Sequence, residues 1–154
     1  GCSKKSWGSQ MRKSSLSKMK TEDVVSLFVV ISREQGEALE KFETRKYNRI
    51  FGQVHALELE LASRLGDQRA QLLPLLDHMN LQVKVNAAYA LLPIAKSAAF
   101  ATLKWVADSK YMPFAMYARG SVEAIEENDF PRGSNPNSIY RHAYLAQQAK
   151  KQQL

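Results

Sequence analysis

The chain of 154 residues is 45% apolar and 24% charged, as expected for one globular domain with a hydrophobic core. It contains no run of 18 or more apolar residues, which excludes a membrane-spanning helix, and its single cysteine, Cys2, excludes an internal disulfide framework and a cysteine-based zinc site. The net charge of +7 resides in the ends of the chain, since residues 1–20 carry six basic residues and no acid whereas residues 21–127 carry 12 basic and 14 acidic residues.

Residues 1–20 are rich in serine, lysine and glycine and show no apolar periodicity, which predicts a disordered basic leader or a vector-derived remnant. An alternative is lipidation. The sequence GCSKKS at 1–6 resembles a myristoylation signal, with Cys2 as a palmitoylation site and Lys4 and Lys5 as the basic supplement. We favour the unmodified leader, because short charged ends are common in proteins.

The first helical hairpin is predicted over residues 21–66. Thr21 caps a helix over residues 22–41, and a second helix runs from residue 44 to Gly66, where a left-handed C-cap is expected. Apolar residues recur at helical spacing on the inner face of the first helix, with Gln35 as the exception. They are Val24, Leu27, Phe28, Ile31, Ala38 and Leu39.

Residues 67–95 predict a second hairpin with unequal helices. A short helix over 67–77 is bent or ended early by Pro74, which lacks a backbone N–H. Asn80 is a good cap for the next helix, over 81–95, whose inner face is rich in alanine. Small residues on that face favour close packing against neighbouring helices.

The third hairpin is predicted over residues 97–127. One helix begins at Ser97, residues 109–113 form a turn, and a second helix covers residues 113–127, where Gly120 would allow a close helix approach. Residues 128–154 predict a loop followed by a C-terminal helical tail.

Three successive hairpins predict an all-α domain over residues 21–127. Repeat architectures need about three stacked units before each unit covers its apolar face. We therefore expect a short right-handed α-α superhelix of the HEAT or armadillo type, with the C-terminal helical tail outside it. A four-helix bundle with extra helices is the alternative.

Three segments resemble a small family of bacterial HEAT-like proteins that has no assigned function. They are KYNR at 46–49, GDQRAQLLPLLDH at 66–78 and QVKVNAA at 82–88. The resemblance covers roughly residues 19–127 and implies an armadillo-like fold, without any catalytic residue. It departs from the usual HEAT pattern at Lys84, where such repeats usually have arginine.

The sequence predicts no catalytic residue, no metal site and no cofactor. His55, His78 and His142 lack a histidine or cysteine at metal-ligand spacing, and no glycine-rich phosphate loop or nucleophile elbow is present. A DNA glycosylase is a remote alternative, since Trp105 and Asp108 can share a helix face beside Lys104, Lys110 and Arg119. The body of the domain is not basic overall, which argues against it.

We therefore expect a non-enzymatic, cytoplasmic protein-interaction module with an unknown protein partner. The predicted surface is a groove formed by the second helix of each hairpin, with polar contacts and one aromatic anchor. The expected partner-binding residues are Arg49, Gln53, Lys84, Asn86, Tyr89 and Arg119. An immunity protein that neutralises a bacterial toxin is one version of this hypothesis, and a nucleic-acid-binding protein is the alternative.

Overall fold

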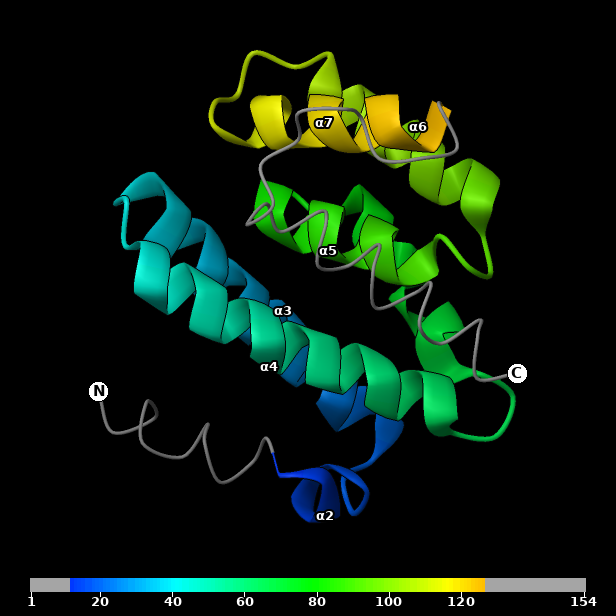
Figure 1. Ribbon diagram of the computed structural model, residues 1–154. Coiled ribbons are helices and arrows are strands. Elements are labelled where there is room, and N and C mark those ends of the chain that lie inside the picture. The colour runs from blue at the N-terminus through cyan, green and yellow to red at the C-terminus, as the bar shows by residue number, and fades with distance from the viewer. Residues whose placement is uncertain (1–11, 127–154) are drawn as a thin grey trace.

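The computed structural model describes residues 12–126, and within this range every regular element is helical (Figure 1). The elements are α2 (Lys13–Leu16), α3 (Thr21–Glu40), α4 (Thr44–Ser63), the 3-10 helix η2 (Gln68–Asp77), α5 (Leu81–Leu91), α6 (Lys96–Ala107) and α7 (Phe114–Glu126). The all-α prediction is thus confirmed for these residues. The loop and tail expected over 128–154 lie outside the described residues.

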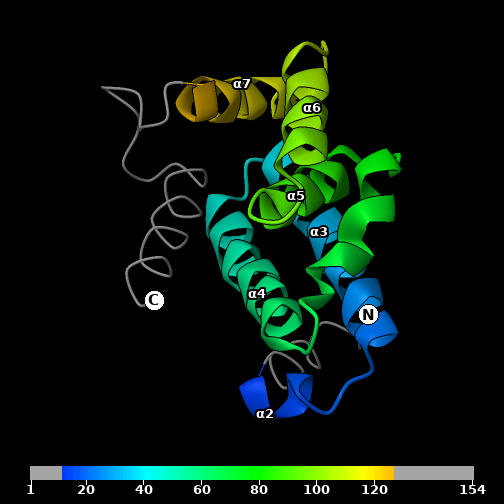
Figure 2. The ribbon, with the colours of Figure 1, turned by 90° about the vertical axis from the view of Figure 1, so that its right-hand side faces the viewer.

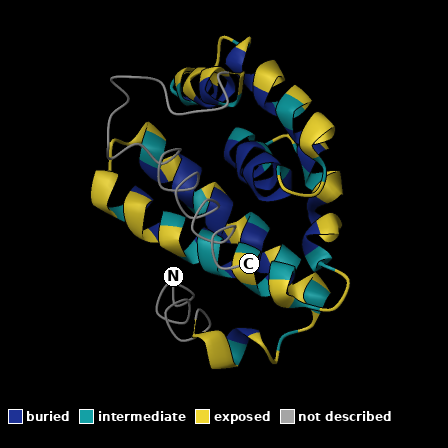
Figure 3. Cartoon of the chain, turned by 45° about the vertical axis from the view of Figure 1, so that its right-hand side comes forward, coloured by how far each residue is buried: buried dark blue, intermediate teal, exposed yellow. Residues whose placement is uncertain are grey.

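The helices pack in sequential pairs, α3 with α4, η2 with α5 and α6 with α7. The helix α5 lies between the α3–α4 pair and the α6–α7 pair (Figure 1, Figure 2). Nine of its 11 residues are buried, and it appears in Figure 3 as a dark-blue helix enclosed by the others. Its alanine-rich sequence allows this, because small side chains let neighbouring helices approach from several sides. The hydrophobic core therefore forms around α5.

Some helix ends are as predicted and others differ. The Asn80 side chain accepts hydrogen bonds from the backbone N–H groups of Gln82 at 3.0 Å and Val83 at 3.1 Å, so it caps α5 as predicted. The segment around Pro74 is a 3-10 helix rather than a bent α-helix. At the end of the first hairpin α4 stops at Ser63, earlier than expected, and Gly66 has the predicted positive φ of 79°. Leu65, at helical spacing from the buried Leu61, is 97% exposed because it lies past the end of the helix.

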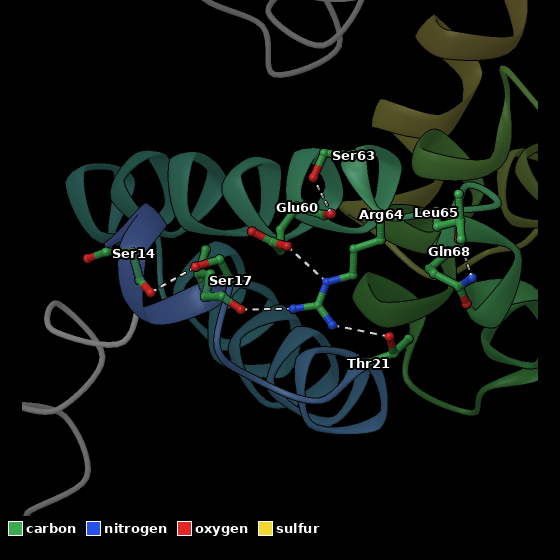
Figure 4. Close-up of polar contacts among 9 residues, drawn as sticks. Ser14, Ser17, Thr21, Glu60, Ser63, Arg64, Leu65 and Gln68 are labelled. Carbon is green, nitrogen blue, oxygen red and sulfur yellow. Dashed lines mark hydrogen bonds and ion pairs between the residues drawn. The ribbon is translucent and has the colours of Figure 1, made fainter.

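The prediction of a disordered leader is wrong for residues 12–20. The Leu16 side chain is buried. The Arg64 guanidinium, at the end of α4, binds residues 16 and 21 through hydrogen bonds (Figure 4). Its Nη2 donates to the Leu16 carbonyl at 2.8 Å and its Nη1 to Thr21 Oγ1 at 3.1 Å, while Nε donates to Glu60 Oε2 at 2.8 Å. One isolated leucine carries no periodicity, so sequence patterning missed this contact.

Close helix packing occurs at a glycine other than the expected one. A Cβ added to Gly120 would meet nothing within 4 Å, so the predicted close approach at that position is wrong. A Cβ on Gly36 of α3 would lie 2.9 Å from the Gln82 Cβ of α5. The absence of a side chain at Gly36 therefore allows α3 and α5 to pack closely.

Candidate functional site

The predicted groove is not an open surface. It required α4, α5 and α7 to line one face, but α5 is enclosed by η2, α6 and α3 and makes little contact with α4. Of the predicted contact residues, Asn86 and Tyr89 are 6% and 7% exposed. Their burial contradicts their prediction as partner-binding residues. Arg49 is exposed on α4 and Gln53 is half-buried there, so no finding tests their role.

Asn86 is the centre of a buried hydrogen-bond network between α3 and α5. Its Nδ2 donates to Ser32 Oγ at 2.9 Å and to Gln35 Oε1 at 2.8 Å, and its Oδ1 accepts from Gln82 Nε2 at 2.9 Å. Gln35 Nε2 has no partner among the described residues. Buried polar groups are costly unless they are paired, so this network fixes how α3 docks on α5. Gln35, the polar exception in the predicted apolar face, was the sequence signal for it.

Tyr89 is also a core residue. Its hydroxyl lies 2.7 Å from Ser121 Oγ, which joins α5 to α7. Burial raises the pKa of Tyr89 to about 12, although the Ser121 hydrogen bond opposes part of that shift. Burial likewise raises the pKa of Tyr47 on α4, with further contributions from Tyr89 and Tyr117. Both phenols are therefore neutral near pH 7 and act in packing.

Two predicted groove cations bind the backbone instead. Lys84 Nζ donates to the Leu76 carbonyl at 2.6 Å, and Arg119 Nε donates to the Ala107 carbonyl at 2.8 Å. These carbonyls lie at the C-terminal ends of η2 and α6, where helix carbonyls lack intrahelical partners. Lys84 and Arg119 therefore stabilise helix ends, and Arg119 remains exposed while Lys84 is half-buried.

Aromatic and methionine side chains are exposed where α6 turns into α7. Trp105, Tyr111, Met112 and Met116 are 55%, 61%, 58% and 55% exposed. A shallow, open hollow lies there, which we call the junction hollow. It is lined by Trp105, Asp108, Ser109, Lys110 and Tyr111. The sequence pattern singled out Trp105, Asp108 and Lys110 but not Tyr111 or the two methionines, because a turn has no periodicity that marks them as exposed.

We searched the described part of the chain for a cluster of metal-binding side chains and for a membrane-spanning helix. Among residues 12–126, no three His, Cys, Asp or Glu side chains gather as ligands for a metal ion. His78 Nδ1 accepts the backbone N–H of Asn80 at 2.9 Å, and His55 lies 3.7 Å from Glu58. No helix in this range is both long and apolar enough to cross a bilayer.

Comparison with known proteins identifies a matching family model and a similar solved structure. A family model described as Domain of unknown function (DUF2019) matches residues 22–126. The crystal structure of the protein RPA1889 from Rhodopseudomonas palustris CGA009 is similar, with 34% sequence identity and a TM-score of 0.71. The similarity covers 75% of this chain and 96% of that one. A comparison with curated proteins gave no match. The chain therefore belongs to the DUF2019 family.

Proposed function

We propose that this protein is a non-enzymatic protein-binding module whose three helix pairs form a short right-handed α-α stack of the HEAT or armadillo type. The sequential pairing of α3 with α4, η2 with α5 and α6 with α7 supports the repeat-like arrangement. The single cysteine supports a reducing compartment, and the proposal places the protein in the cytoplasm.

The observation that carries the protein-binding function is the cluster of exposed large side chains at the junction hollow. Tryptophan and tyrosine dominate the binding energy of protein interfaces, because they bury a large area with few rotatable bonds. Methionine adapts to partner surfaces of different shape. Leu65, Met79 and Phe42 are more exposed still, but each lies at a different turn of the fold. The α6–α7 junction combines both residue types within a few positions of the chain.

The test is affinity capture with the full chain from the organism that encodes it, compared with the double variant Trp105→Ala/Tyr111→Ala. We expect a stoichiometric protein that the wild type captures and the double variant loses, and that forms a complex again when both components are purified. Thermal unfolding of each variant shows that the fold is intact.

Met79→Ala is the matched control, because Met79 is 95% exposed but lies at the η2–α5 turn. The control should capture the partner as well as the wild type does. The proposal is contradicted when wild type and double variant capture the same proteins in equal amounts, or when neither yields a complex that can be rebuilt from purified components.

A further inference from the structure

The Trp105 ring is held in place before any partner binds. Lys84 Nζ lies over the ring, 4.8 Å from its centroid, and the same ammonium donates a hydrogen bond to the Leu76 carbonyl. This cation–π contact joins the end of α6 to α5 and leaves the ring 55% exposed. A side chain that is already ordered loses little conformational entropy on binding, so Trp105 is suited to act as an anchor.

The charge around this ring is predominantly positive. Lys110 lines the junction hollow, Lys84 covers one side of the Trp105 ring, and Lys104 is the exposed neighbour of Trp105 on α6. Asp108 is the single acid among the described residues that line the hollow. The ion pairs within residues 12–126 involve none of these lysines, since they are His55–Glu58, Glu60–Arg64 and Asp67–Arg69. The lining thus holds one lysine and one aspartate, with Lys84 over the Trp105 ring and Lys104 next to Trp105 in the sequence.

An acidic peptide fits this surface better than a nucleic acid does. Nucleic acids bind through many phosphate contacts, which require a strongly basic surface. Residues 21–127 instead carry 14 acidic and 12 basic residues, so the basic side chains around Trp105 are too few to follow a long phosphate backbone. Met112 and Met116 offer apolar contacts that suit a side chain of a protein partner.

We propose that the junction hollow binds an acidic peptide segment that carries an aromatic or aliphatic side chain. The apolar side chain packs on Trp105 and Tyr111, and the flanking carboxylates interact with Lys84, Lys104 and Lys110. This inference rests on the protein-binding function proposed above and adds the chemistry of the partner.

The first experiment selects ligands from a random dodecapeptide phage library on the immobilised full chain. Peptides that also bind the Trp105→Ala/Tyr111→Ala variant are discarded. We expect the remaining peptides to have a net negative charge and at least one large apolar residue. Remaining peptides that are neutral or basic, or a selection with no peptide specific to the wild type, would overturn the proposal.

The second experiment measures affinity and its dependence on charge. The selected peptide is titrated into the Trp7→Phe variant, in which Trp105 is the remaining tryptophan fluorophore. We expect Lys104→Glu/Lys110→Glu to weaken binding by about tenfold, because charge reversal replaces two attractions to the peptide carboxylates with two repulsions. Added salt should weaken binding to the wild type. Equal affinity of both proteins would refute the proposed charge complementarity.

Two comparisons separate this inference from the proposed function. A labelled thymidine oligonucleotide that binds the wild type more tightly than the selected peptide, and that loses affinity in the Trp105→Ala/Tyr111→Ala variant, would overturn both. Partner capture that depends on Trp105 and Tyr111, combined with selected peptides that are neutral or basic, would leave the protein-binding function standing and remove the acidic partner.

Discussion

The helix α5 and the α6–α7 junction differ in which residue types they bury: α5 buries polar side chains, whereas the junction exposes large aromatic ones. On α5 the polar residues Gln82 and Asn86 are buried; Gln82 donates to Asn86, and Asn86 in turn binds side chains of α3. At the junction the large residues Trp105 and Tyr111 face solvent. Residue type alone therefore does not decide whether a helix face meets a partner protein or another helix of the same chain. The number of helices packed around an element decides it, and α5 has neighbours on several sides.

The largest expected effect comes from removing apolar volume in α5. Leu91 is fully buried, so Leu91→Ala should destabilise the fold by about 2–5 kcal/mol through lost burial and the cavity left behind. Met112→Ala at the exposed junction should change stability by less than about 0.5 kcal/mol. Urea unfolding measures both. Similar losses in the two variants would show that the junction is part of the core and would break the comparison.

Asn86→Ala tests the polar part of the same core. The substitution leaves Gln35 Oε1 and Gln82 Nε2 without their hydrogen-bond partner, and we expect a loss of about 2–3 kcal/mol. Asn48→Ala on the exposed side of α4 is the control and should be neutral or slightly stabilising. A neutral Asn86→Ala would mean that the network does not determine how α3 docks on α5.

Alkaline pH tests the burial of Tyr89. Its pKa of about 12 in the fold exceeds the ordinary value of 10, so the unfolded chain releases this proton first. The stability that this shift provides is complete below pH 10 and is lost as pH rises through 12. Between these values the wild type should lose about 2 kcal/mol more than Tyr89→Phe. Urea unfolding at several pH values gives the difference, and parallel curves would contradict the buried position of the hydroxyl.

Two glycines should respond to alanine with opposite signs. Gly36→Ala places a Cβ 2.9 Å from the Gln82 Cβ, where overpacking costs about 1–3 kcal/mol and exceeds the gain in helix propensity. Gly52→Ala on α4 meets nothing within 4 Å and should stabilise the fold by about 0.5–1 kcal/mol. Thermal unfolding distinguishes the two. Stabilisation by both substitutions would show that α3 and α5 do not pack closely at Gly36.

Helical periodicity predicted the pairs and the Asn80 cap, because spacing and capping are local properties of the chain. Local spacing does not predict which pair encloses which helix, so it places Asn86 and Tyr89 in a groove although both side chains are buried. Leu16 is the opposite case, a residue of the predicted leader whose side chain is buried. Its side chain joins the core, and its carbonyl accepts a hydrogen bond from Arg64, which is 48 residues away along the chain; no local pattern records these contacts.

The smallest expected effect on stability is at Tyr111, where folding and binding should respond differently to one substitution. Tyr111 is 61% exposed in the turn before α7, so Tyr111→Ala should leave the free energy of unfolding within about 0.5 kcal/mol of the wild type. The same substitution should weaken peptide binding at the junction hollow, because tyrosine is enriched among the few interface residues whose truncation costs about 2 kcal/mol or more of binding free energy. Unfolding and peptide titration of one variant test the two statements together. A residue that matters for binding but not for folding is the pattern that distinguishes a docking surface from a core. Loss of stability with unchanged binding would instead place Tyr111 with Tyr89 in the packing of the domain.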